Sequence, residues 1–157
     1  MIQRIQSIYL LLIFFTAIAM LFLPLVTFTG YQDGGYNDHY LHGIKLVHSD
    51  GQISDVPNMA DVTGYLLIGT AFISFISIFL YKNRRNQKLA AKFILLLATG
   101  VLYLLVQSHT EIKDSLGGEA EIKIGFYFPV VIMLLSMLVI RSIKKDEDLI
   151  KAADRLR

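Results

Sequence analysis

Four long apolar runs, each close to the length needed to cross a lipid bilayer, divide this sequence of 157 residues. The hydrocarbon core of a bilayer is about 30 Å thick and an α-helix rises about 1.5 Å per residue, so a crossing helix needs about 20 apolar residues. The runs lie at residues 5–27, 62–81, 89–107 and 124–141. We therefore predict an all-α integral membrane protein with four transmembrane helices in a single domain, residues 1–157.

A soluble four-helix bundle and a cleaved signal peptide are the two alternatives. Helices of a soluble bundle keep a polar face, and the first run has none. Charged residues make up only 18% of the chain, whereas a soluble domain is about one quarter charged. A signal peptide has an apolar core of about 7–15 residues, which the first run exceeds. Pro24 lies near the outer end of this run, where we expect a kink or the end of the helix.

The distribution of charge predicts how the chain is oriented. Basic residues of membrane proteins accumulate on the cytoplasmic side. Twelve of the 15 basic residues precede the first run, lie around the start of the third run, or lie at or beyond the end of the fourth. Nine of the 13 acidic residues lie in the other two loops. We therefore predict that both termini are cytoplasmic (N-in/C-in) and that residues 28–61 and 108–123 form extracytoplasmic loops.

Short alternating runs in both outer loops predict strands. In the first loop, residues 44–48 and 52–54 flank an Asp-Gly pair, which indicates a hairpin. In the second loop, residues 111–113 and 119–124 alternate polar and apolar on either side of a Gly-Gly pair. A single hairpin is only marginally stable, so we expect the two to pair as one small extracytoplasmic β-hairpin cap, or neither to form. The alternative for the second loop is extension of the third and fourth helices.

The predicted cytoplasmic segments supply candidate contact residues. The basic turn between the second and third runs suits anionic lipid headgroups or an acidic partner. The tail, residues 144–157, is predicted to be a short helix whose apolar face lies on the membrane surface or binds a partner. The alternative is a simple continuation of the fourth helix into solvent. The candidates for lipid or partner contact are Arg84, Arg85, Lys88, Leu149, Ile150, Ala153 and Leu156.

Several kinds of chemistry have no support in the sequence. The chain has no cysteine, which removes disulfides, thiolate metal sites and dithiol redox reactions. No ionisable residue lies well inside the four runs, which counts against a proton relay or an ion-coupled transporter. Small polar residues such as Ser74 and Ser136 are expected to form hydrogen bonds between helices. The net charge of +2 is too small to indicate nucleic-acid binding, and no catalytic or cofactor-binding motif is recognised.

Histidines of the first outer loop are the nearest approach to a metal motif. His39, His42 and His48 are weak candidate ligands. A zinc site needs three or four ligands held by surrounding hydrogen bonds, and loop histidines meet this need poorly. We therefore predict no metal and no cofactor.

The two ends of the chain resemble those of a known family. Residues 1–10 (MIQRIQSIYL) and 146–157 (DEDLIKAADRLR) are similar to the start and the end of a Bacteroidetes inner-membrane family known only as domain of unknown function 4293. The similarity also covers the length and the four-span plan of the chain. It implies four helices in a bacterial inner (cytoplasmic) membrane. It implies no activity and no functional residues, because none is assigned to the family.

Three functions remain as hypotheses. The first is a non-enzymatic accessory or assembly subunit of a larger inner-membrane complex, with the bilayer and other membrane protein subunits as partners. The second is a small transporter or channel formed by self-association. The third is a membrane enzyme that acts on lipid through the histidines and aspartates of the outer loops.

Overall fold

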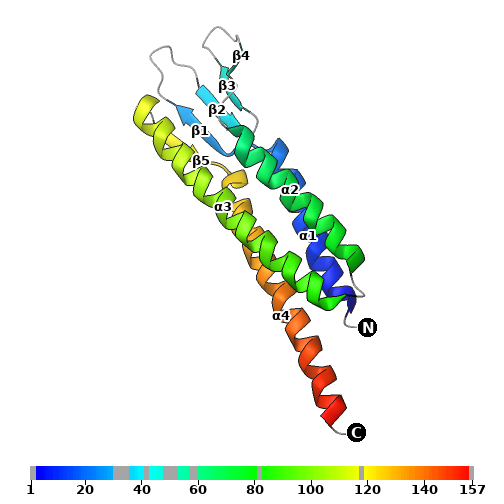
Figure 1. Ribbon diagram of the computed structural model, residues 1–157. Coiled ribbons are helices and arrows are strands. Elements are labelled where there is room, and N and C mark those ends of the chain that lie inside the picture. The colour runs from blue at the N-terminus through cyan, green and yellow to red at the C-terminus, as the bar shows by residue number, and fades with distance from the viewer. Residues whose placement is uncertain are drawn as a thin grey trace.

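Four long helices form an antiparallel bundle with a small sheet at one end (Figure 1). The computed structural model describes residues 3–29, 36–40, 43–47, 53–56, 60–80, 83–116 and 119–155. All four helices are long and apolar enough to cross a membrane, which confirms the predicted fold class. Both ends of the chain lie away from the sheet (Figure 1). The helices are α1 (Gln3–Phe22), α2 (Ala60–Phe79), α3 (Arg84–Leu116) and α4 (Phe128–Arg155).

The ends of the helices differ from the predicted runs in three places. Helix α1 ends at Phe22 rather than at residue 27, because Pro24 cannot donate the next helical hydrogen bond. Helix α3 continues beyond residue 107 to Leu116. Helix α4 continues without a break to Arg155, so residues 144–155 prolong the fourth helix and do not form a separate tail helix.

The bundle has a narrow interior and a broad apolar exterior. Each helix packs against two neighbours, in the order α1, α2, α3, α4 and back to α1. Only 28–33% of each apolar stretch is buried inside the protein, and large apolar side chains such as Phe72, Leu96 and Tyr103 are exposed. Such an exterior suits hydrocarbon and not water. The buried residues recur every three or four positions, so each helix turns one stripe inward.

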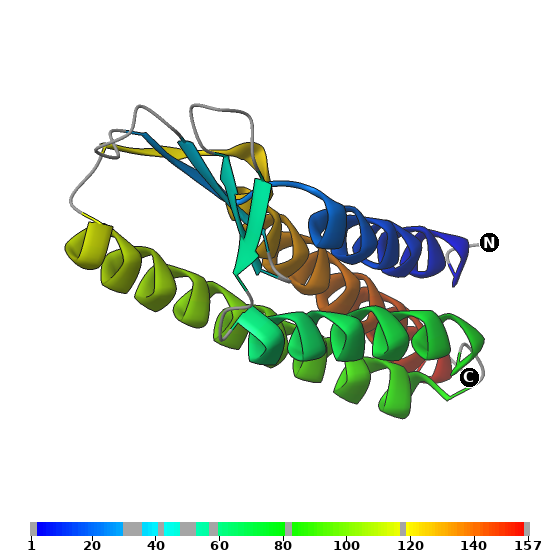
Figure 2. The same cartoon turned by 90° about the horizontal axis from the view of Figure 1, so that it is seen from above.

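The sheet combines strands from both loops at its end of the bundle (Figure 2). All neighbouring strands are antiparallel, in the order β4-β3-β2-β1-β5. Strand β1, next to the edge strand β5, pairs with β2 on one side and with β5 on the other, and its pairing with β5 joins the two loops. The strands are β1 (Val26–Thr29), β2 (Tyr36–Tyr40), β3 (Gly43–Val47), β4 (Ile53–Val56) and β5 (Glu119–Ile122).

Only one of the two predicted hairpins is present as predicted. Strands β3 and β4 pair with Val47 opposite Ile53, as the Asp-Gly pair indicates. In the second loop, residues 111–113 belong to helix α3, so the predicted hairpin there is wrong. Strand β5 forms nevertheless, because β1 offers it a partner: Val26 lies opposite Ile122. The alternative of helix extension is therefore correct for the first half of this loop only.

A close approach of two chain segments connects the sheet to the bundle. The backbone N–H of Lys123 donates to the carbonyl of Leu25 over 2.9 Å. The buried Gly125, in the short 3-10 helix η2 (Ile124–Tyr127), lies beside the carbonyl of Pro24. A Cβ atom added to Gly125 would lie 2.7 Å from that carbonyl oxygen. This crossing therefore needs glycine, because a backbone atom cannot move aside as a flexible side chain can.

Replacing this glycine should weaken the fold. Gly125→Ala forces the two segments apart, and such overpacking costs about 1–3 kcal/mol. Gly100→Ala is the matched control, because a Cβ at Gly100 meets nothing within 4 Å. Thermal unfolding in detergent should show a lower melting temperature for Gly125→Ala and an unchanged or higher one for Gly100→Ala. Equal melting temperatures would contradict the close approach.

Candidate functional site

The inward stripes of the four helices end in polar residues at the end of the bundle opposite the sheet. The stripe of α1 consists of Gln6, Leu10, Ile13, Ala17 and Met20. The stripe of α4 consists of Ile132, Ser136, Val139, Ile143 and Asp146. Those of α2 and α3 likewise end in Ser77 and Gln87. We call Gln6, Ser77, Gln87 and Asp146 the polar layer. It contains one residue from each helix, all of them buried.

One hydrogen bond in the polar layer joins the first helix to the last. The Gln6 side-chain amide donates from Nε2 to Oδ2 of Asp146 over 2.5 Å, and both residues are buried. Asp146 is only 5% exposed. A buried charged group without a partner costs several kcal/mol, so this bond ties the first turn of α1 to the distal half of α4.

The other two helices contribute a second hydrogen bond. Gln87 Nε2 donates to the backbone carbonyl of Ser77 over 3.3 Å. This carbonyl lies in the last turn of α2, where helical carbonyls have no partner within their own helix. Gln87 therefore satisfies the end of α2 from the first turn of α3. Its own Oε1, like Asp146 Oδ1, is buried and has no hydrogen-bond partner within the described ranges.

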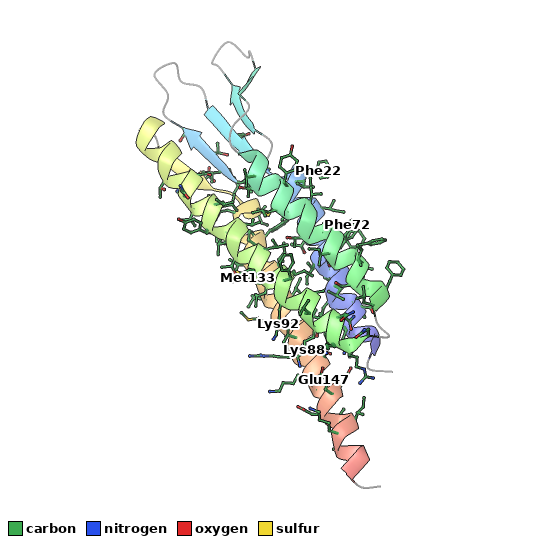
Figure 3. All side chains as sticks on the ribbon, viewed as in Figure 1. Phe22, Phe72, Lys88, Lys92, Met133 and Glu147 are labelled. Carbon is green, nitrogen blue, oxygen red and sulfur yellow. The ribbon has the colours of Figure 1, made fainter. Side chains whose placement is uncertain are left out.

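An ion pair closes the outer side of the layer. Lys88 Nζ lies 2.7 Å from Glu147 Oε2, with both side chains partly exposed. Figure 3 shows these two side chains on the outer surface, at the level where α3 begins. Lys88 follows Gln87 and Glu147 follows Asp146, so the ion pair places the polar-layer residues of α3 and α4 at the same height along the bundle. Exposed Leu89 is close to this level, so the layer lies near the edge of the apolar exterior.

A further interhelical hydrogen bond lies one turn deeper. Ser74 Oγ donates to the Leu10 carbonyl over 2.5 Å and holds α2 against α1. This confirms the expected role of Ser74. Thr70, Ser77 and Ser136 instead bond to carbonyls four residues back in their own helices.

The histidines proposed as weak metal ligands are placed only in part. His39 lies in β2, where it pairs with Val26 and Ile44. His42 and His48 lie outside the described residues. Within the described ranges, no group of three or more histidines and acidic residues could hold a metal ion.

The described members of the predicted contact set lie around the end of the bundle that carries the termini. Arg84 and Arg85 begin α3, and Lys88 is held by Glu147. Leu149 and Ile150 are exposed on α4. Ala153 also lies in α4, and Leu156 is outside the described residues.

Sequence reasoning missed the burial of Asp146. The residue follows Lys144 and Lys145 beyond the fourth apolar run, at the start of the predicted tail helix, where its charged neighbours give no sign of burial. The signal that could have found it is the spacing of Ser136, Val139, Ile143 and Asp146, which places Asp146 on the same helical face as the apolar inward residues.

Comparison with known proteins identifies the family. The family model described as domain of unknown function (DUF4293) matches residues 2–156, nearly the whole chain. The chain therefore belongs to this family. No curated protein matches it.

The bond between Gln6 and Asp146 can be tested by a double-mutant cycle. Gln6→Leu leaves Asp146 Oδ2 buried without its donor, which should cost about 1–3 kcal/mol. Adding Asp146→Leu removes the unpaired charge, so the double variant should regain most of this loss. Thr16→Val is the control, because the half-buried Thr16 donates to the Leu12 carbonyl of its own helix. Chemical unfolding in detergent measures each step, and strictly additive losses would contradict a direct interaction.

Proposed function

We propose that this member of the family is a non-enzymatic accessory or assembly subunit of a larger complex in a bacterial cytoplasmic membrane, with both termini in the cytoplasm. The observation that carries the proposal is the long projection of α4 beyond the other helices (Figure 1). The bilayer accounts for the apolar exterior of the bundle. The bilayer does not account for apolar side chains on the part of α4 that extends beyond the basic residues at the edge of this exterior.

The projection carries such a surface. Leu149 and Ile150 are 50% and 45% exposed, and they follow the basic residues Lys144 and Lys145. Helix α4 is continuous through this region, so Leu149 and Ile150 lie on the projecting helix and do not fold back onto the bundle. Adjacent exposed apolar side chains in water are unfavourable and are typical of protein–protein contact sites. We call Leu149 and Ile150 the apolar pair.

The surroundings of the apolar pair indicate the chemistry of the partner. A shallow groove of about 400 Å³ on α4 is lined by Arg141, Lys144, Lys145, Asp148 and Leu149. Three cations beside an apolar side chain suit a partner segment that offers an apolar anchor and acidic residues. Charge of this kind directs the orientation of binding, while the buried apolar anchor supplies most of the affinity. A cytoplasmic segment of another membrane subunit meets both needs.

The sidedness proposed here rests on the distribution of basic residues over the bundle. The end that carries the termini has Arg84, Arg85, Lys88 and Lys92 on α3 and Arg141, Lys144 and Lys145 on α4. At the sheet end, β5 carries two acidic residues, Glu119 and Glu121. Basic residues near membrane helices are retained in the cytoplasm, so the sheet is assigned to the extracytoplasmic side.

Loss of the apolar pair should release the partner. Leu149→Ser with Ile150→Ser removes the anchor from a surface outside the bundle, so membrane insertion and the melting temperature should be unchanged. Mild-detergent purification from native membranes, followed by mass spectrometry, should show co-purifying membrane subunits with the natural chain and loss of about ten-fold or more with the variant, which corresponds to about 1.4 kcal/mol.

The control for this experiment lies in the same exposed segment. Lys151→Ser with Ala152→Ser makes the same number of changes and leaves the apolar pair intact, so it should retain the subunits. A natural chain that purifies alone, or equal recovery with both double variants, would contradict the accessory role.

The orientation can be tested because the chain has no cysteine. Single cysteines are introduced at the exposed positions Thr29, on β1 of the sheet, and Asp148, on the projection of α4. In intact cells a membrane-impermeant maleimide should label Thr29→Cys and not Asp148→Cys, and both should react after permeabilisation. The reverse pattern would invert the proposed orientation.

A further inference from the structure

We propose that the polar layer is a binding site for one small hard monovalent cation of the sodium class, held by Asp146 and Gln87. This goes beyond the accessory role, and either proposal stands if the other fails. Two buried oxygen atoms carry the inference: Asp146 Oδ1 and Gln87 Oε1 have no hydrogen-bond partner among the residues that the structure describes. Their residues are only 5% and 1% exposed. Buried polar atoms are almost always satisfied, so two orphans in one layer need an explanation.

Both orphan atoms are acceptors, which limits what can occupy the site. The amide of Gln87 must turn its nitrogen to the Ser77 carbonyl, because a carbonyl can only accept. Its oxygen is therefore left for another ligand. The same reasoning turns the nitrogen of Gln6 to the Asp146 carboxylate. Two acceptors cannot bond to each other, so the missing group is a donor or a cation.

The charge of the layer favours a cation over water. Among the described residues, no ion pair to Asp146 is found, and neighbouring Lys88 is held by Glu147. Within the part of the chain that the structure describes, Asp146 accepts its hydrogen bond from the neutral amide of Gln6. Water would satisfy the orphan oxygens but would leave the carboxylate charge uncompensated, and a buried uncompensated charge is costly. A bound cation satisfies both atoms and removes the net charge.

The ligand types select the kind of cation. Carboxylate and amide oxygens are hard ligands, which suit alkali and alkaline-earth ions and not soft transition metals. The layer supplies one formal negative charge, which matches a single positive charge. The Ser77 carbonyl, in the last turn of α2, bonds to Gln87 and brings the partial negative charge of a helix C-terminus to the layer. Water molecules can complete the coordination shell at the edge of the apolar exterior.

The location gives such an ion a structural effect. Asp146 is bonded to α1 and lies on α4, and Gln87 lies on α3 and is bonded to α2. An ion held between these two residues would therefore link all four helices at one end of the bundle. Binding to the folded state and not to the unfolded state raises stability by mass action. The purified protein should accordingly be more stable in sodium than in a large organic cation.

The experiment compares the full chain in detergent at constant ionic strength, in sodium chloride and in choline chloride. At a sodium concentration ten times its Kd, the melting temperature should rise by about 4 °C. Equilibrium binding of radioactive sodium should be saturable, with a single ion per chain. Potassium and lithium are tested as competitors to define the selectivity.

Two variants and one control locate the site. Asp146→Asn keeps an acceptor for Gln6 but removes the charge, and Gln87→Leu removes the second oxygen. Both should abolish the sodium-dependent rise in melting temperature. Asp148→Asn removes an exposed carboxylate two residues along the same helix, and it should retain the full rise. Sodium binding that survives both polar-layer variants would place the ion elsewhere and overturn the proposal.

The natural chain alone also decides the question, so the result does not depend on the variants folding. If it binds no sodium and melts at the same temperature in both salts, the layer holds water or a proton and the proposal is wrong. Neither outcome depends on whether partner subunits co-purify, which keeps this test separate from that of the accessory role.

Discussion

The absence of water in the hydrocarbon core is the constraint on which the rest of this structure depends. Backbone N–H and C=O groups must be satisfied within the protein there, and helices satisfy them without help from neighbours. The hydrophobic effect offers little reason for apolar helices to associate in lipid. Close packing of small residues such as Ala17, Ala91 and Ala98, together with hydrogen bonds such as Ser74 to Leu10, therefore holds the bundle together.

The two ends of the bundle meet different demands. At one end, β1 begins four residues after α1 ends and pairs with β5, just before α4. This pairing joins two loops that are far apart in the sequence, and the contact of Gly125 with Pro24 fixes where they cross. At the other end, α1 and α4 meet through Gln6 and Asp146. The bundle is thus closed at both ends by contacts between its first and last spans.

The polar layer and the projection of α4 are adjacent on the same helix and present different chemistry. Asp146 points into the bundle, whereas the apolar pair begins three residues later and is exposed. An ion in the layer would hold α4 against the other helices, so the base of the projection would be fixed relative to the bundle. The two proposals are therefore compatible, although each rests on its own observation.

The sequence by itself determined the number of helices, their apolar character and one hairpin. Each of these depends on residues that are near in sequence: runs of about 20 apolar residues, or an Asp-Gly turn between β-prone segments. Even the end of α1 followed from Pro24.

Only the tertiary structure decided the partner of β5 and the burial of Asp146. The partner of β5 is a strand from the other loop, some 90 residues earlier in the chain. Asp146 is buried because α1 and α3 pack on either side of α4, and the local sequence of charged residues around it indicates solvent. Local pattern fixes what a segment can form, and contacts between distant segments decide which of its faces are buried.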